Sequence, residues 1–254
     1  MENQKPPFNR RKFLLNAAKL GAAGVAGYVL YAGRKEALSK VDPAPPEPTT
    51  HDFLTLPMLA SVIEGETTIQ WITRKKSYSW VEYGISKDLG KRAEPVTDGL
   101  TEANKHLHRV TLKDLTPGTV YYYRVCSKEI TSFMREDEIE FGKTIQSDVF
   151  SFNTISHQKK EWNWLIMNDI HDRPESIKLL YKTAAVTPDF VFLNGDMFNY
   201  TENEKQIITN LFAPCSELFA YQTPLLFSRG NHDMRGVYAR ALKDYFAFGN
   251  AFFY

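Results

Sequence analysis

Three short apolar runs, each followed at once by a polar motif, constrain the fold of this chain more than any other feature. Segments with the periodicity of amphipathic helices separate the runs at 175–185 and 202–212, and a third such segment covers 237–246. This order predicts an α/β domain over residues 160–254, with parallel strands joined by right-handed crossovers. All three motifs then lie at the carboxyl edge of the sheet, where open α/β sheets bind ligands. The runs with their motifs are Trp164–Met167 with Asn168–Asp172, Phe190–Leu193 with Asn194–Met197, and Pro224–Phe227 with Ser228–Asp233.

The side chains in these motifs are oxygen and nitrogen donors without a thiolate, a set that suits Fe, Mn, Zn or Co. Asp169 and His171 can bind one cation from a single loop, and the two oxygens of Asp196 can bridge two cations. Asn231 offers an amide oxygen to the second cation. This is the composition of a two-metal hydrolase site. The alternative is that the motifs are polar turns of an inert α/β domain.

Residues 53–156 show a different pattern, in which short β-rich runs alternate with turn residues. Alternation places Ile69 and Trp71 on one face of a strand, and no helical period follows as far as Thr154. This pattern predicts an antiparallel β-sandwich, to which we assign no chemistry. The hydroxyl of Tyr121, after Leu115–Thr119, is expected to bond back to upstream backbone as a tyrosine corner. The aromatic residues are then core and corner, or else a binding face for carbohydrate or a partner.

The amino-terminal segment, residues 1–33, combines a basic head with a moderately apolar stretch. Asn9–Leu14 contains the pair Arg10 and Arg11, and mostly apolar residues continue to Tyr31. This layout predicts an export signal and resembles the twin-arginine signal of bacteria, with the translocation machinery as a partner. The alternative is a membrane anchor behind a basic pair. We expect a periplasmic or extracellular protein, attached to the membrane if the segment is not cleaved.

Residues 34–52 are rich in proline and predict a semi-rigid linker. The net charge of the chain is +1, but residues 1–33 hold five basic residues against one acidic residue, so the remainder carries about −3. This mildly acidic body argues against a nucleic-acid partner. Cys126 and Cys215 are the only cysteines, which excludes a zinc site built mainly of thiolates and leaves a disulfide between them open.

The three motifs in order closely resemble the calcineurin-like metallophosphoesterase family. Its pattern is Asp-x-His, Gly-Asp and Gly-Asn-His-Asp/Glu at the ends of successive strands. The resemblance implies that Asp169 and His171 bind the first metal ion, that Asp196 bridges the two ions, and that Asn231 binds the second. The implied cofactors are thus two divalent or trivalent metal ions.

The resemblance also implies catalytic roles for the last two residues of the third motif. His232 is expected to face the substrate phosphoryl group, as transition-state stabiliser or as acid to the leaving oxygen. Asp233 is expected to orient the imidazole of His232 from behind. Arg229 and Arg235 are each expected either to touch phosphate or to lie solvated at the surface.

The sandwich resembles the fibronectin type III-like domain that precedes the catalytic domain of purple acid phosphatases. The matching residues are Trp71, Val81–Gly84 and Leu115–Arg124. Purple acid phosphatases have a glycine where His171 stands and a tyrosine where Asn199 stands. Because a histidine in the first motif makes a tyrosine ligand unnecessary, a coloured tyrosinate-iron centre is not expected.

The family pattern continues with a further histidine and a Gly-His-x-His motif, which supply the remaining metal ligands. No histidine follows His232 in the 254 residues. The α/β metallophosphoesterase domain is therefore expected to be truncated at its C-terminus, either as a fragment of a longer protein or as an inactive product.

Together these resemblances imply an exported dinuclear-metal phosphoesterase that hydrolyses phosphate monoesters by metal-activated hydroxide, in the manner of acid phosphatases. The expected partner is a small phosphate ester. The alternatives are a metal-dependent phosphodiesterase and a non-catalytic cell-surface binding protein with a degenerate, incomplete site.

Overall fold

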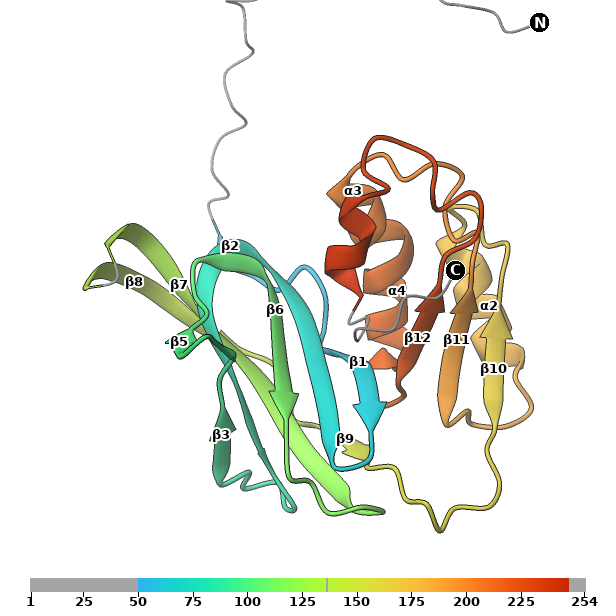
Figure 1. The fold of residues 1–254 in the computed structure, drawn as a ribbon, viewed down its shortest axis with the longest axis horizontal. Coiled ribbons are helices and arrows are strands. Elements are labelled where there is room, and N and C mark those ends of the chain that lie inside the picture. Colours follow the sequence, from blue (N-terminus) through green and yellow to red (C-terminus); the bar gives the residue numbers. More distant parts are fainter. Residues whose placement is uncertain (1–49, 136, 247–254) are drawn as a thin grey trace, which may run out of the picture. The chain divides into compact units, whose positions relative to one another are not determined.

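A β-sandwich followed by a small parallel α/β sheet makes up the fold, as the sequence predicts (Figure 1). The computed structural model describes residues 50–135 and 137–246, so the predicted signal and most of the linker lie outside the described residues. The strands of the sandwich region are β1 Met58–Ile63, β2 Glu66–Gly84, β3 Lys91–Ala93, β4 Val96–Thr97, β5 Leu100–Thr101, β6 Lys105–Leu112, β7 Val120–Arg135, β8 Glu138–Gln146 and β9 Phe150–Asn153.

The long strand β2 joins the two layers of the sandwich. Its first half pairs with β1 and β6, its second half pairs with β3 and β7, and the register shifts between Ile72 and Ser77. One strand therefore supplies both the run around Trp71 and the run around Val81. The alternating apolar side chains of both halves point into one buried cluster, which the predicted alternation of Ile69 and Trp71 anticipates.

The tyrosine corner is confirmed. The backbone N–H of Thr116 donates to the hydroxyl oxygen of Tyr121 over 3.1 Å, and this bond ties the turn before β7 to the strand itself. Tyr121 is buried and its ring stacks on Phe152 with the centroids 6.1 Å apart. These aromatic residues belong to the core.

The three predicted parallel strands are confirmed as β10 Trp164–Met167, β11 Phe190–Asn194 and β12 Leu225–Ser228, in the order β10-β11-β12. Met167 pairs with Leu193, which pairs with Phe227, so the three strands end level with one another. Figure 1 shows them side by side with their arrowheads pointing the same way. The polar motifs that follow are therefore brought to one edge.

Helix α2 runs over Pro174–Thr183, close to the predicted segment, and begins with a proline in its first turn. The second helical segment is longer than predicted. It contains α3 Glu204–Ile207, a π-helix η1 Ile208–Phe212, α4 Ala213–Cys215 and a second π-helix η2 Ser216–Ala220. Pro214 lies inside it, and the N–H of the preceding Ala213 donates to the carbonyl of Ile208, five residues back. A proline and a widened turn therefore coexist in one continuous helical stretch.

The predicted helix over 237–246 is wrong. The chain there forms turns and then a short 3-10 helix, η3, over Ala241–Tyr245. The N–H of Tyr238 donates to the carbonyl of Thr201 in another loop, and the N–H of Ala239 donates only three residues back. The N–H of Ala241 also donates to the carbonyl of Tyr238, three residues back, so the segment has 3-10 rather than α-helical hydrogen bonding.

The main core lies between the parallel sheet and its helices, and it also includes Met58 and Ile72 from the sandwich. Gln70 of β2 donates to the carbonyl of Tyr245 over 2.7 Å, so the two regions share polar contacts as well. Cys126 and Cys215 are both buried free thiols, so no disulfide joins them. Among the described residues, no helix has the length and apolar character needed to cross a membrane.

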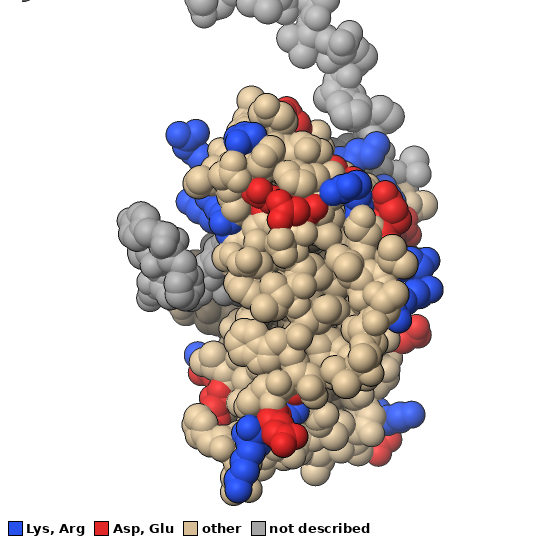
Figure 2. All heavy atoms as spheres, turned by 90° about the vertical axis from the view of Figure 1, so that its right-hand side faces the viewer, with Lys and Arg blue, Asp and Glu red and all other residues tan. Residues whose placement is uncertain are grey.

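The outer side of β10 is less covered than the inner side. Met167 is buried, whereas Trp164 and Ile166 are 56% and 55% exposed. Figure 2, which views the right-hand side of Figure 1, shows a broad central area without charged side chains and charged groups toward its two ends. The sheet therefore buries one face in the core and leaves apolar side chains at its edge strand.

Candidate metal centre

The loop after β10 is held in an unusual backbone conformation. Asp169, His171 and Asp172 have φ angles of 56°, 49° and 61°, in the left-handed region that residues other than glycine rarely adopt. Their N–H groups donate to the carbonyl oxygens of residues 195, 196 and 197 over 3.2, 3.0 and 2.9 Å, which fastens this loop to the loop after β11. Such strain persists only where surrounding contacts enforce it, and it is concentrated at functional sites.

Two glycines allow the loops after β11 and β12 to touch. A Cβ atom on Gly195, whose φ is 79°, would lie 2.6 Å from the nitrogen of Gly230. A Cβ atom on Gly230 would lie 2.2 Å from Oδ1 of Asp196. The glycines of the Gly-Asp and Gly-Asn-His-Asp motifs are thus required by the close approach of the two loops.

Asp233 does not orient His232, and that prediction is wrong. Its side chain is fully buried. Oδ2 accepts from the N–H groups of Asp196 and Gly230, and Oδ1 accepts from those of Met197 and Phe198, over 2.8 to 3.1 Å. Burial raises the pKa of this carboxyl, and the four N–H groups oppose that effect. Asp233 therefore links the second motif to the third through their backbone N–H groups. Both of its oxygens are occupied by these groups and do not contact the imidazole of His232.

Three predicted site residues come together at the edge. Ring nitrogens of His171 and His232 and a carboxylate oxygen of Asp196 all lie within 4.8 Å of one another. The two imidazole rings meet edge to face with their centroids 4.6 Å apart. Oδ1 of Asp196 also accepts from the N–H of His232 over 2.8 Å. His232, predicted as a catalytic residue rather than a ligand, thus lies inside the same group of donors.

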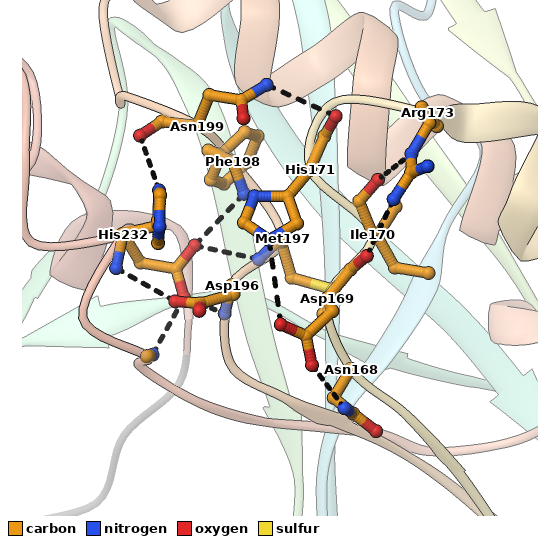
Figure 3. A network of polar contacts seen from close by, with 12 residues as sticks. Asn168, Asp169, Ile170, His171, Arg173, Asp196, Met197, Phe198, Asn199 and His232 are labelled. Atoms are coloured by element: carbon orange, nitrogen blue, oxygen red, sulfur yellow. Dashed lines mark hydrogen bonds and ion pairs between the residues drawn. The ribbon is translucent and has the colours of Figure 1, made fainter.

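Asp169 lies beside this group, with Oδ1 3.5 Å from Nε2 of His171 and its side chain 61% exposed (Figure 3). The amide of Asn168 donates to its other carboxylate oxygen. Arg173 donates to the carbonyl oxygens of Ile170 and Asp169 over 2.9 and 3.1 Å, which supports the strained loop from outside. Asp169 is therefore an accessible carboxylate at the open side of the site.

Asn231 lies between Asp196 and Arg235. With its amide nitrogen toward Asp196 it donates to Oδ2 over 3.0 Å, and its oxygen accepts from Nη2 of Arg235 over 2.8 Å. A cation held between Asn231 and Asp196 requires the opposite orientation, with the amide oxygen beside the carboxylate. The structure thus places Asn231 next to the predicted bridging residue, and the orientation of its amide decides what it binds.

The ring of His232 has two further neighbours. Its Nδ1 lies 3.2 Å from the carbonyl oxygen of Asn199 (Figure 3). Nη1 of Arg235 lies 3.2 and 3.3 Å from the two ring nitrogens, so the guanidinium rests against the imidazole. Of the two arginines considered from the sequence, Arg235 therefore contacts the site.

The residues at this edge fit a metal ion. His171 Nδ1 is buried and has no hydrogen-bond partner among the described residues. A buried imidazole nitrogen without a partner is costly unless it binds a ligand. The neighbouring donors are carboxylate oxygen and imidazole nitrogen, the ligand types that Zn, Fe, Mn and Co take in proteins.

Sequence reasoning assigned no role to two residues around the site. Asp172 accepts from Asn199, and Arg173 supports the loop after β10. Asp172 is the last residue of the first motif and Arg173 directly follows it. The signal available was their place beside the motifs, but the sequence does not say which distant backbone groups they contact.

This geometry defines an α/β domain with a candidate metal centre at the carboxyl edge of its parallel strands. Residues 164–253 match the family described as calcineurin-like phosphoesterase, and residues 58–154 match the purple acid phosphatase N-terminal domain. The two matches follow the domain order predicted from the sequence, with the purple acid phosphatase N-terminal type first and the calcineurin-like phosphoesterase type second.

Two solved structures resemble the chain at low sequence identity. Purple acid phosphatase PPD1 from seeds of yellow lupin (Lupinus luteus) is 18% identical, with a TM-score of 0.47 over 70% of this chain. The structure of PhoD is 14% identical, with a TM-score of 0.49 over 75% of this chain. The chain spans 35% and 41% of the length of these two proteins. No curated protein matches it.

Proposed function

We propose that this chain belongs to a metal-dependent phosphoesterase that hydrolyses phosphate monoesters with two metal ions. The observation that carries the proposal is the convergence of His171, Asp196 and His232 within 4.8 Å at the carboxyl edge of a calcineurin-like phosphoesterase domain. Phosphoryl transfer to water requires ligands for the cations and a group that faces the substrate. The same edge of the sheet offers both, because the histidine lies beside the cation ligands.

Four side chains would hold the cations. Asp169 and His171 supply a carboxylate and an imidazole from one strained loop, Asp196 supplies two oxygens at the centre, and Asn231 supplies its amide oxygen. When bound, the cations would activate water and neutralise charge on the phosphoryl group. The left-handed backbone at residues 169, 171 and 196 fixes the directions of these donors before any ligand arrives.

His232 and Arg235 would act on the substrate. The imidazole lies among the donor atoms and can stabilise the phosphoryl oxygens or protonate the leaving oxygen. The guanidinium of Arg235 adds a positive charge beside the ring, which favours an anionic substrate. Asp233 keeps the loops in register, so its part is to hold the geometry of these groups.

The preference for monoesters over diesters is supported by the sandwich, whose family is the N-terminal domain of purple acid phosphatases. The test is turnover of p-nitrophenyl phosphate against bis-p-nitrophenyl phosphate, with metal content measured on the same purified full-length protein. We expect faster hydrolysis of the monoester and loss of activity on removal of metal by a chelator. Faster hydrolysis of the diester would support the phosphodiesterase instead. Absence of both activities and of bound metal would leave the non-catalytic binding protein as the better account.

We also propose that the protein is exported through the twin-arginine route. The support is the sequence of residues 9–14, with Arg10 and Arg11 ahead of a moderately apolar stretch. A double substitution, Arg10→Lys with Arg11→Lys, keeps the charge and should retain the full chain in the cytoplasm of a bacterial host. Lys5→Arg is the matched control and should not change location. Normal export of the double variant would refute this route.

A further inference from the structure

The carboxylate of Asp172 is the centre of a hydrogen-bond network that none of the predicted site roles uses. Oδ2 accepts from the backbone N–H and the side-chain amide of Asn199 over 2.8 and 3.1 Å. Oδ1 accepts from the amides of Gln206 and Asn210 over 2.7 and 3.2 Å. All four donors are neutral, and among the described residues no cationic side chain contacts this carboxylate. One side chain thus joins the loop after β10, the loop after β11 and the second helical segment.

The helical part of this network comes from a widened turn. Gln206 lies in α3, whereas Asn210 lies in the π-helix η1. A π-turn changes which side chains share a face of a helix, and such turns are frequent at functional sites. Here both amides reach the same carboxylate oxygen. The backbone of Asp172 is itself left-handed, with a φ of 61°, so its position is enforced rather than intrinsic.

Asn199 connects Asp172 to the histidine. Its N–H and its side-chain amide are both held by Asp172, and the same amide lies 3.3 Å from the carbonyl of His171. Its own carbonyl oxygen lies 3.2 Å from Nδ1 of His232. A carbonyl oxygen can only accept, whereas the guanidinium of Arg235, 3.2 and 3.3 Å from the two ring nitrogens, can only donate. In the neutral ring, a proton on Nδ1 and a lone pair on Nε2 is the arrangement that satisfies both neighbours. Asp172 therefore holds residue 199, whose carbonyl selects this tautomer, through its N–H and its side-chain amide.

We propose that Asp172 is a positioning residue for His232. Its carboxylate clamps Asn199, and the carbonyl of Asn199 then sets the ring orientation and the Nδ1-protonated tautomer of the histidine. This is the task that the sequence assigned to Asp233, whose carboxylate is occupied by four backbone N–H groups. The kinetic consequence rests on the proposed function, whereas the tautomer is a property of the protein alone.

The test is Asp172→Asn in the full chain. An asparagine keeps the shape but has one acceptor oxygen, so it cannot hold all four amide donors. Two-bond nitrogen–proton NMR spectra of the histidine rings report the tautomer, and His232→Gln identifies the signal of His232 by its disappearance. We expect the wild type to be protonated at Nδ1 and Asp172→Asn to show a mixture of tautomers. In hydrolysis, kcat should fall by about 10- to 100-fold with KM nearly unchanged.

Asp114→Asn is the matched control, because Asp114 is an exposed aspartate with a φ of 55° in the sandwich region. It should leave tautomer and kinetics as in the wild type. If Asp172→Asn does not fold, Asn199→Ala replaces it, since it removes the side-chain half of the clamp and should shift the tautomer in the same direction by less. A wild-type tautomer in the folded variant, or an Nε2-protonated wild type, would overturn the proposal. A wild type that shows the predicted tautomer but hydrolyses nothing would refute the proposed function and leave the clamp standing.

Discussion

His108 in the sandwich and His171 at the edge of the parallel sheet show two uses of the same side chain. His108 is 5% exposed and its Nε2 lies 2.8 Å from the hydroxyl of Thr73, and burial lowers its pKa to about 3. His171 has a left-handed backbone and a buried Nδ1 without a hydrogen-bond partner among the described residues. The first histidine is a neutral core residue, and the second has the properties of a ligand.

The same contrast holds for the residues around each histidine. In the sandwich, Trp71 Nε1 donates to the hydroxyl of Ser127, and that hydroxyl also pairs with Ser79 over 2.8 Å. These neutral groups satisfy one another on relaxed strands. At the edge, carboxylates and imidazoles meet on loops that only close backbone contacts can hold. A buried polar residue alone therefore does not distinguish a site from a core. A buried polar atom without a hydrogen-bond partner does so when it occurs together with a strained backbone.

Asp233→Asn should have the largest effect on stability and would test whether the edge depends on backbone clamps. The amide offers one acceptor oxygen where the carboxylate offers two, so two buried N–H groups lose their partner at about 1–3 kcal/mol each. We expect the free energy of unfolding to fall by about 2–5 kcal/mol in urea titrations. The exposed Asp98→Asn should change it by less than about 0.5 kcal/mol. Equal effects would contradict the assigned role of Asp233.

Gly195→Ala should have the next largest effect, because its Cβ would meet the backbone of Gly230 at 2.6 Å. We expect a loss of about 2–4 kcal/mol from positive φ and overpacking together, with weaker metal binding in calorimetry. Gly99→Ala is the control, since Gly99 has a φ of 81° but open space around it. The difference between the two variants isolates the contact between the loops. If both variants lose the same stability, the positive φ alone, and not the contact between the loops, explains why position 195 requires glycine.

Some features of the fold and of the candidate site could be predicted from the sequence, and others could not. The strands and the sandwich were predictable, because apolar runs, alternation and the Pro-Gly turn are local signals. The convergence of His171, Asp196 and His232 followed from the common edge of parallel strands. The contacts of Asp233 and Asp172 were not predictable, because all their partners except Gly230 are backbone and amide groups 27 or more residues away, and only tertiary packing decides where those groups lie. For the same reason the segment before Tyr245 failed to form the helix that its periodicity indicates.

His108→Gln would test the sandwich half of the comparison. The unfolded chain takes up a proton at the ordinary pKa of 6.5, whereas the folded chain does so only near pH 3. Between these values the unfolded state binds more protons, so the histidine lowers the free energy of unfolding as pH falls, by about 1.4 kcal/mol per pH unit. The variant should lose this part of the slope between pH 6 and pH 4. An unchanged slope in urea titrations would show that His108 is not held neutral.

Tyr121→Phe should have the smallest effect. It removes the hydroxyl that accepts from the N–H of Thr116 and keeps the buried ring, so we expect a loss of about 1 kcal/mol in thermal or urea unfolding. Tyr122→Phe on the next position, half-buried and without a hydrogen bond to its hydroxyl among the described residues, should lose less. Activity should not change in either variant. A drop in hydrolysis by Tyr121→Phe would mean that the sandwich reaches the site.

The most direct test of the metal centre is the metal content of the purified full-length protein and of its Asp196→Asn variant. The carboxylate of Asp196 is one of three donor groups that lie within 4.8 Å of one another, and it is the proposed bridge between two ions. The account predicts bound transition metal in the wild type and loss of metal from both positions in Asp196→Asn, with hydrolysis of p-nitrophenyl phosphate lost alongside. A wild type without metal, or a variant that keeps full occupancy and activity, would contradict it.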